Sequence, residues 1–547
     1  MSGTVGRASA ALASGTIVSR LLGFVNASVL AYVIGVRGSG PNAFALANQL
    51  PTYVYAIVAG GLLSAVLVPH IVKAATQADG GQSFVNRLVT LGVTAFVATT
   101  ALATLAAPLI VRLYALGGGD DALAGGGLDL AIVLAYWCLP QILFYAVYAL
   151  VGEVLNARGI FGPAAWAPAL NNVVMIGVLV LFGVLYGVSP AHRDPATWDA
   201  TRIAMLAGGA TLGVALQALL LMLFWRRTGL RFHPDFRWRG VGLGAPARAA
   251  GWVFGMVLVI QLTNFVQTNV AATADSSDAS LAVLRVTWLI FMLSHSIIAI
   301  SIATPYFTRM SAAVRDNDIP AVRADLSASL RTIGMLVAAA GAALAAAALP
   351  FSAFFAQDPA EARVIAIVLL GFLVGLVPFS TLYVVQRAYY ALGDTRTPFL
   401  LQIVQAAIFI AGALAMLAAP SAWIAAGIGL ATSVSVIVQA IVAAVILRNR
   451  LGGGGGAIVR RFGVFALTSI PSAGAGVGVL ALMGGFDEAG FATAGQWQGI
   501  VTTAIVGASV ILVFFGVLAA TRAPELRGLR SSLRRNGKAA GSEISDT

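Results

Sequence analysis

The sequence contains few charged residues and almost no cysteine. Asp, Glu, Lys and Arg make up 10% of its 547 residues, whereas a soluble domain carries about 25%. The single cysteine, Cys138, has no second thiol with which to form an intrachain disulfide. The chain also lacks a GxxxxGK[ST] phosphate loop and any His, Cys or carboxylate cluster with metal-ligand spacing. We therefore expect neither a soluble enzyme nor a cofactor or metal site.

Long apolar runs take the place of the missing charge. Hydrophobic residues form 59% of the chain, in recurring runs of roughly 20 residues or more, the length that spans a bilayer as a helix. The runs are continuous rather than alternating, which favours a helical bundle over a β-barrel. We expect an all-α polytopic membrane protein of about fourteen transmembrane helices, over 9–35, 42–72, 87–115, 127–156, 164–187, 202–225, 249–273, 281–307, 330–354, 362–391, 397–418, 422–447, 461–483 and 498–521.

The positive charge lies between these runs and predicts their orientation. Most of the 33 Lys and Arg residues fall in segments that share one side of the membrane if the N-terminus is cytoplasmic. We therefore expect a multi-pass protein of the bacterial cytoplasmic (inner) membrane with both termini inside. The net charge of +12 follows from this topology, so it does not indicate a nucleic-acid partner.

Segment 226–248 is the longest basic loop, and it has two interpretations. It reads RRTGLRFHPDFRWRGVGLGAPAR, with aromatic residues spaced among arginines. It is either a solvated cytoplasmic loop or an interfacial segment that lies on anionic lipid headgroups. The glycines of 452–456 predict a flexible linker, and the polar composition of the tail 522–547 predicts disorder.

Proline positions suggest that the chain contains a repeat. Prolines in similar contexts recur at offsets between 235 and 242 residues: Pro69 and Pro305, Pro108 and Pro350, Pro140 and Pro378, Pro163 and Pro398. We expect two six-helix lobes, 1–225 and 249–447, joined by the basic loop 226–248 and followed by a linker with two helices, 448–521, and the tail 522–547. An even helix number in each lobe makes this a parallel repeat, the architecture of transporters that work by alternating access.

Arg20 is the most informative polar residue of the predicted membrane core. A central arginine costs roughly 3 kcal/mol on insertion scales, so Arg20 either snorkels to the interface or faces a watery cavity and binds an anion. Asn26 lies about 120° from it around the same helix. Asn42, at the start of the second helix, continues this polar surface.

The seventh and eighth predicted helices are also polar. Gln261, Asn264 and Thr268 share one face of the seventh, although an interhelical hydrogen bond explains any single amide as well as a cavity does. In the eighth, Arg285 is either an outer-end charge or a buried one, and His295 is expected to be a packing residue. The cores of these helices and of the first two contain no carboxylate, which argues against a proton-coupled drug or cation antiporter.

Four motifs carry a family resemblance. SRLLGF in the first helix, NAFALANQLP in the second, LNARGIFGPAAWAPALNN before and within the fifth, and YYALGDTRTPF after the tenth resemble the MurJ (MviN) family. These are lipid II flippases of the multidrug/oligosaccharidyl-lipid/polysaccharide (MOP) exporter superfamily, and the resemblance covers roughly the first 450 residues. It implies a cationic cavity for the pyrophosphate of undecaprenyl-linked peptidoglycan precursor, and a lipid-tail groove formed by the last two helices.

The resemblance and the polar residues together predict the site. Arg20 matches a family arginine, whereas many members carry charged residues where this chain has Asn26, Asn42, Tyr55 and Leu289. Arg285, one turn before Leu289, could replace the arginine missing there. We predict substrate contacts from Arg20, Asn26, Asn42, Tyr55, Gln261, Asn264, Thr268 and Arg285, and structural or gating roles for Gly23, Pro51, Asn171, Asn172, Asp394, Thr395, Arg396 and Pro398. Asp394 or Thr395 would cap the following helix, with Pro398 in its first turn.

The predicted function is translocation of lipid II from the inner to the outer leaflet, driven by the membrane potential. The expected partners are the undecaprenyl-pyrophosphate-linked precursor, membrane lipids and cell-wall synthases. Two alternatives remain open at this stage: a flippase for another lipid-linked glycan, and a non-transporting membrane scaffold for cell-wall synthesis. The sequence also leaves open whether an ion is coupled to transport.

Overall fold

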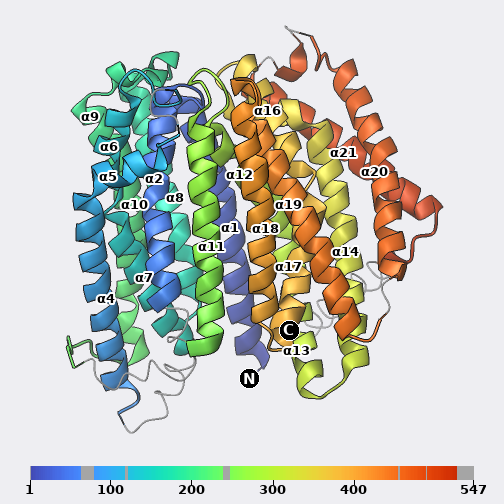
Figure 1. Ribbon diagram of the computed structural model, residues 1–547, viewed down its shortest axis with the longest axis horizontal. Helices are drawn as coiled ribbons and strands as arrows, with labels where there is room; N and C mark the ends of the chain where they lie inside the picture. Colours follow the sequence, from blue (N-terminus) through green and yellow to red (C-terminus); the bar gives the residue numbers. More distant parts are fainter. Residues whose placement is uncertain are drawn as a thin grey trace, which may run out of the picture. The chain divides into compact units, whose positions relative to one another are not determined.

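The computed structural model describes residues 2–62, 79–117, 121–237, 247–453, 456–487, 490–493 and 495–526. Within these ranges the regular structure is entirely helical (Figure 1). Twelve helices there are long and apolar enough to cross a membrane. A thirteenth span is obtained if α16 (Pro359–Leu373) and α17 (Leu376–Ala391), bent by 43°, are counted together. The prediction of an all-α polytopic membrane protein is confirmed.

The predicted count of about fourteen spans includes one that the described residues contain only in part. The second predicted span, 42–72, begins in α2 (Ser39–Leu62), and its remaining residues lie outside the described ranges. Seven of the other thirteen match single helices, and six are each divided between two or more helices, such as 87–115 into α4 (Gln82–Leu105) and α5 (Ala107–Tyr114); several begin or end some residues away from the predicted bounds. The predicted first helix at 9–35, for example, is α1 (Ser2–Ile34).

The chain forms two compact units. The first comprises Met1–Leu293, Phe355–Val368 and Thr395–Ser435. Besides α1 and α2, and parts of α16 and α19 (Ser421–Arg450), it contains α4 (Gln82–Leu105), α5 (Ala107–Tyr114), α6 (Gly127–Cys138), α7 (Gln141–Ala157), α8 (Gly162–Tyr186), α9 (Ala200–Ile203), α10 (Gly209–Leu223), α11 (Ala247–Ala272), α12 (Leu281–His295) and α18 (Arg396–Ala415). Here α8 packs against both α1 and α10, and α2 packs against α6, α7 and α11.

The second unit comprises Ser294–Phe354, Leu369–Asp394 and Val436–Thr547. Its helices, besides α17 and the rest of α19, are α13 (Ser301–Arg315), α14 (Ile319–Ala346), α15 (Ala348–Ser352), α20 (Gly456–Leu482) and α21 (Gln496–Ala520). In this unit α14 packs against α13, α17, α20 and α21, with Met335, Phe465 and Phe514 in a buried apolar cluster. His295 is also buried here and lies 3.0 Å from the Ser380 hydroxyl, as expected of a packing histidine.

Of the four proline pairs, Pro108 and Pro350 occupy similar places in their helices, whereas Pro69 lies outside the described residues. The helix before Pro108 ends at Ala106 (φ −88°, ψ 10°), and the helix before Pro350 ends at Ala347 (φ −96°, ψ 10°). Each proline then stands near the start of the short helix that follows, α5 or α15, where its missing N–H costs least. This one matched pair leaves the repeat a prediction. The first compact unit combines the predicted first lobe with parts of the second, so the lobe boundaries stay a prediction.

Candidate functional site

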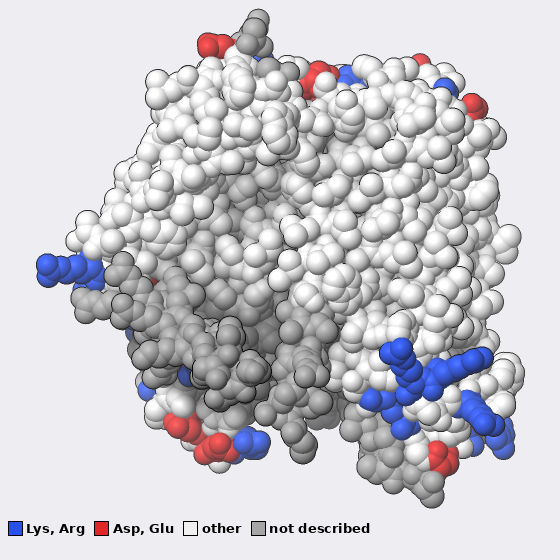
Figure 2. Space-filling model, turned by 180° about the vertical axis from the view of Figure 1, so that it is seen from behind, with Lys and Arg blue, Asp and Glu red and all other residues white. Residues whose placement is uncertain are grey.

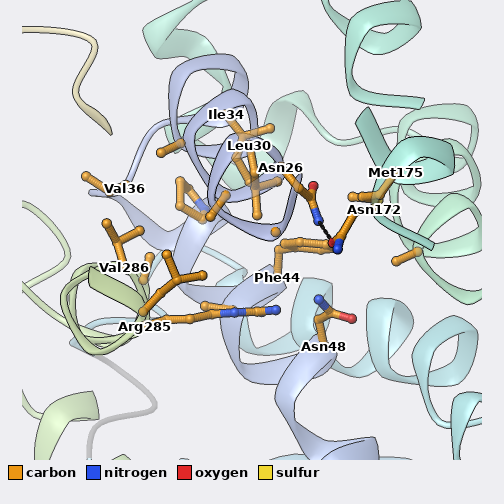
Figure 3. A pocket seen from close by; sticks show the side chains of 18 of the residues that line it. Asn26, Leu30, Ile34, Val36, Phe44, Asn48, Asn172, Met175, Arg285 and Val286 are labelled. Carbon is orange, nitrogen blue, oxygen red and sulfur yellow. Dashed lines mark hydrogen bonds between the residues drawn. The ribbon is translucent and has the colours of Figure 1, made fainter. Parts of the chain in front are cut away.

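The first compact unit contains a cavity of about 270 Å³ between α1, α2, α7, α8, α10 and α12 (Figure 3). Part of its wall is apolar and includes Leu30, Phe44, Met175 and Val286. The rest of the wall carries polar side chains, which are Asn26, Asn48, Gln141, Tyr145, Asn171, Asn172 and Arg285. The lining contains one cation and no carboxylate, so the cavity is suited to an anionic or strongly polar ligand.

Arg285 supplies this positive charge from the second turn of α12. Its side chain extends across the cavity toward Asn48 of α2 (Figure 3). With its oxygen turned toward the guanidinium, the Asn48 amide accepts from Nη2 at 2.9 Å and from Nη1 at 3.2 Å. The ion pairs formed by the described residues do not include Arg285. A neutral amide therefore positions the arginine without cancelling its charge.

A second layer of hydrogen bonds lies behind Asn48 and holds Gln141 in place. Gln141 Nε2 lies 3.3 Å from the Asn48 amide and donates to Thr211 Oγ1 at 3.1 Å. The Tyr145 hydroxyl donates to Gln141 Oε1 at 3.2 Å. The sequence analysis did not select Gln141 or Tyr145. The only feature of the sequence that could have pointed to them is their place just after Pro140, where the span formed by α6 and α7 is interrupted.

Asn26 and Asn172 face each other across the α1–α8 contact. Asn26 Nδ2 donates to Asn172 Oδ1 at 3.4 Å, and Asn172 Nδ2 donates to the Ser19 carbonyl at 3.0 Å. Asn26 Oδ1 is buried and has no protein partner among the described groups. Such an oxygen can accept a hydrogen bond from a ligand hydroxyl or amide. Gly23 and Asn171 also line the cavity, so with Arg285 five predicted positions meet there.

Arg20 lies on α1 outside the cavity lining. It is partly buried, six residues before Asn26, which corresponds to about 9 Å along the helix axis. The bond from Asn172 to Ser19 holds this part of α1 against α8. The structure therefore separates the two predicted arginines: Arg285 faces the cavity, and Arg20 lies further along α1.

Asn42 and Tyr55 are also outside the cavity. Asn42 is fully buried; it donates to the Ala122 carbonyl at 3.3 Å and accepts from the Ala282 N–H at 3.1 Å. These bonds fix the first turn of α12, the helix that carries Arg285. Tyr55 packs its ring against Phe96 and Tyr145, with centroid distances of 5.7 and 5.8 Å. Both residues support the cavity wall from behind.

The amides of α11 share one face, as predicted, but that face contacts α2. Gln261 Nε2 donates to the Tyr53 carbonyl at 2.9 Å, and Asn264 Nδ2 donates to Gln261 Oε1 at 3.1 Å. The Thr268 hydroxyl donates to the Asn264 carbonyl at 2.8 Å. The Gln261 bond holds α11 against α2, the bonds of Asn264 and Thr268 stay within α11, and none of the three residues lines the cavity.

The remaining motif residues lie at helix ends or within helices. Pro51 is buried inside α2. Thr395 precedes α18 but makes no side-chain cap bond, so of the two predicted caps, Asp394 or Thr395, the Thr395 alternative is wrong. The carboxylate of Asp394 forms an ion pair with Arg450. Arg396 lies 5.9 Å from the Trp252 ring, and Pro398 is in the first turn of α18, as predicted.

An ion cluster borders the end of the cavity near Gly35 and Val36. Arg193, in the 3₁₀ turn Pro190–Arg193, places Nη2 2.8 Å from Asp358 Oδ2 and 2.9 Å from Glu361 Oε1. The buried Glu361 carboxylate also accepts from the Val36 N–H at 3.4 Å. Burial acts to raise the pKa of Asp358, but the hydrogen bond from Arg193 and that from the Glu361 N–H lower it overall. We call Arg193, Asp358 and Glu361 the outer latch, since the predicted topology places them outside.

The family is decided by a match over most of the chain. Residues 30–493 match the model of the family described as lipid II flippase MurJ. The chain belongs to this MurJ family. Its curated relatives include proteins named "Probable lipid II flippase MurJ". The protein from Haemophilus influenzae is 26% identical over 408 residues, covering 71% of this chain and 76% of that protein. The one from Thermotoga maritima is 25% identical over 431 residues, covering 78% and 82%.

Solved structures agree on the fold. A lipid II flippase MurJ in an inward closed conformation superposes with a TM-score of 0.72 at 18% identity, covering 93% of this chain and 99% of that one. An inward-facing multidrug resistance MATE transporter of the MOP superfamily superposes with a TM-score of 0.61 at 17% identity, covering 79% and 94%. The chain therefore has the fold of a MOP transporter, and its family is a transporter family rather than an enzyme family.

Proposed function

We propose that this chain moves lipid II from the inner to the outer leaflet of the bacterial cytoplasmic membrane. Its membership of the MurJ family supports the substrate. The observation that carries the mechanism is the cavity: Arg285 faces it from α12, the lining contains no carboxylate, and neutral amides from α1, α2 and α8 surround it. Alternating access by the two predicted lobes would expose this cavity to each side in turn.

The cavity chemistry fits a pyrophosphate. A pyrophosphate diester carries about two negative charges, and moving them unaided through hydrocarbon is prohibitive. Each Nη of Arg285 carries a second N–H besides the one donated to Asn48, and the Asn172 and Gln141 amides offer neutral donors nearby. Arg20, about 9 Å along α1 from Asn26, would be an earlier contact for an anion that arrives from the cytoplasmic side.

The size of the cavity limits what this conformation accepts. About 270 Å³ is slightly below the range of ligand pockets, which measure about 300–1,000 Å³. The pyrophosphate with part of a sugar would fit, whereas the full sugar–peptide headgroup requires the cavity to widen. We therefore assign the present cavity to phosphate recognition and expect the headgroup to bind in a more open state.

The membrane potential is a sufficient driving force for the proposed transport. Moving two negative charges outward along an inside-negative potential releases about 4.6 kcal/mol per 100 mV. The proposal uses no ATP and no cofactor. It requires both termini to be cytoplasmic, in agreement with the positive charge of the predicted inside loops.

The test is lipid II exposure by the purified protein in vesicles of controlled potential. Arg285→Gln and Arg20→Gln should each slow exposure by at least about ten-fold, because a charge-assisted hydrogen bond contributes about 1.5–3 kcal/mol. Arg202→Gln is the matched control, since Arg202 stacks on Tyr186 outside the cavity. Undiminished exposure by both variants would reject this site, and a rate that ignores the potential would reject the driving force.

Two alternatives remain distinguishable from lipid II transport. A flippase for another lipid-linked glycan would share the phosphate site but fail to expose lipid II in the same vesicles. A non-transporting scaffold that binds cell-wall synthases would fail with every lipid-linked substrate. Rescue of cells depleted of their own peptidoglycan flippase would exclude the scaffold, and loss of rescue in Arg285→Gln would connect that rescue to the cavity.

A further inference from the structure

The segment that follows α10 is held along α4 by a ladder of hydrogen bonds. Backbone N–H groups of alternate residues donate to side chains four residues apart on α4: Arg231 to Gln82 at 2.9 Å, His233 to Asn86 at 3.3 Å and Asp235 to Thr90 at 3.0 Å. Positions four apart share one face of a helix, and alternate donors are typical of an extended chain. We call residues 230–237 the ribbon.

Charged side chains strengthen the same contact. Asp235 accepts from Arg87 of α4 at 3.1 Å and from Arg237 Nε and Nη2, both at 3.0 Å. The ribbon is therefore a fixed structure rather than a freely solvated loop. Its docking on α4 uses main-chain groups and the Asp235 carboxylate.

The ribbon has two different faces. In an extended chain, side chains two residues apart point the same way, so Phe232, Pro234 and Phe236 share one face and Arg231 and His233 share the other. Phe232 is 42% exposed and Phe236 is 64% exposed. A partly exposed apolar face of this kind, held rigidly, is expected at a membrane interface.

The helix before the ribbon indicates where that interface lies. Leu219, Met222 and Leu223, in the last turns of α10, are 49%, 50% and 75% exposed, as lipid-facing side chains are. Trp225 follows directly, and its ring contacts Phe232 with a centroid distance of 6.1 Å. Aromatic rings gather where hydrocarbon meets headgroups, so the ribbon begins at the level where the lipid-facing surface ends.

The charge of the segment selects the sign of the lipid. Residues 226–237 contain four arginines and one carboxylate, Asp235. Arg226, Arg227 and Arg231 are exposed. Figure 2, seen from behind, shows basic side chains gathered at the lower right, which corresponds to the left of Figure 1, where α4 and α10 lie. We propose that the ribbon is a docking surface for anionic phospholipid headgroups, with Phe232 and Phe236 in the interface and the three arginines on lipid phosphates.

The experiment measures how deep each face of the ribbon lies. The full chain carries Cys138→Ala and one new cysteine labelled with bimane, either Phe236→Cys on the apolar face or His233→Cys on the opposite face as control. Each protein is placed in nanodiscs of phosphatidylcholine alone or mixed with phosphatidylglycerol, with a nitroxide lipid spin-labelled near the headgroup as quencher. We expect strong quenching at position 236 with phosphatidylglycerol, weaker quenching without it, and little at position 233.

The arginines are tested in the same assay. Each exposed arginine near an anionic surface contributes roughly five-fold in affinity, so the triple variant Arg226→Gln/Arg227→Gln/Arg231→Gln should remove the dependence on phosphatidylglycerol. If Phe236→Cys does not fold, Phe232→Cys reports on the same face. Equal quenching at positions 236 and 233, or no dependence on the anionic lipid, overturns the proposal. The proposal is also overturned if the cysteine at position 236 is labelled by a thiol reagent in these nanodiscs but not in native membranes, because a protein would then cover the ribbon.

Discussion

Arg193 Nη2 lies 2.9 Å from Oε1 of Glu361, a carboxylate with no exposed side-chain surface. The same carboxylate accepts from the backbone N–H groups of Val36 and Gln357, at 3.4 and 2.9 Å. Three segments far apart in the sequence thus meet at one buried acid: the residues after α1, the turn before α9 and the first turn of α16. Since Gly35 and Val36 also line the cavity, the outer latch borders one end of it.

Breaking the latch from one side should open the cavity to the outside. Arg193→Gln leaves Glu361 buried without its cation, a change that typically costs about 3–5 kcal/mol. The conformation in which Glu361 reaches water then becomes more populated. We expect a cysteine introduced into the lining as Ala27→Cys, in a Cys138→Ala chain, to react several-fold faster with a membrane-impermeant maleimide added outside.

Two controls distinguish the latch from general damage. Arg202→Gln removes an arginine from the same end of the unit, where it bonds to the Thr197 carbonyl and stacks on Tyr186, and it should leave the labelling rate unchanged. Arg193→Gln combined with Glu361→Gln removes both charges, so it should be closer to the wild-type rate than Arg193→Gln alone. Equal acceleration by Arg202→Gln would show that the latch is not the closing element.

Gly38 makes a second, independent prediction about this end of the cavity. Its φ of +98° is unfavourable for other residues, and a Cβ there would lie 2.5 Å from the Arg193 Cβ. Gly38→Ala should therefore cost more than the roughly 1 kcal/mol of a positive φ alone. Gly229→Ala is the matched control, because Gly229 has φ +75° with nothing within 4 Å of the added methyl. Thermal unfolding in detergent measures the stability of both variants. A similar loss of stability in the two would mean that the methyl group at position 38 does not clash with Arg193.

The fold was predictable because it depends on features that a single segment displays. Apolar runs of membrane-spanning length predict helices, and the positions of Asn26 and Gln261 on their helices follow from helical geometry. What each face contacts depends on distant segments. Gln261 therefore shares the predicted face of α11 but bonds to Tyr53 of α2 rather than lining the cavity. Glu361 escaped notice for the same reason, since Arg193 and Val36 identify its role only in three dimensions.

Asn42 tests the difference between a ligand and a support. It is fully buried between the Ala122 carbonyl and the Ala282 N–H, and leaving each of these groups unpaired costs about 1–3 kcal/mol. Asn42→Leu should lower the free energy of unfolding by about 2 kcal/mol or more, whereas Asn449→Leu on an exposed turn of α19 should have little effect. A variant of unchanged stability that lost substrate binding would instead return Asn42 to the role of a direct ligand.

Asp235 predicts how the ribbon depends on pH. The hydrogen bonds from Arg237, then that from Arg87, hold the pKa of this carboxyl well below its ordinary value, which is about 3.9 in an unfolded chain. A lowered pKa means that the carboxylate stabilises docking at every pH above about 4, and that this contribution is lost only as pH falls through the lowered value. A bimane label at His233→Cys should therefore keep a high fluorescence anisotropy from pH 8 to about pH 4 and lose it below. Asp235→Asn should show low anisotropy throughout, while Asp316→Asn, at an exposed ion pair with Arg315, should behave as wild type. A transition centred above about pH 4, with tryptophan fluorescence showing the protein still folded, would contradict the role of Asp235.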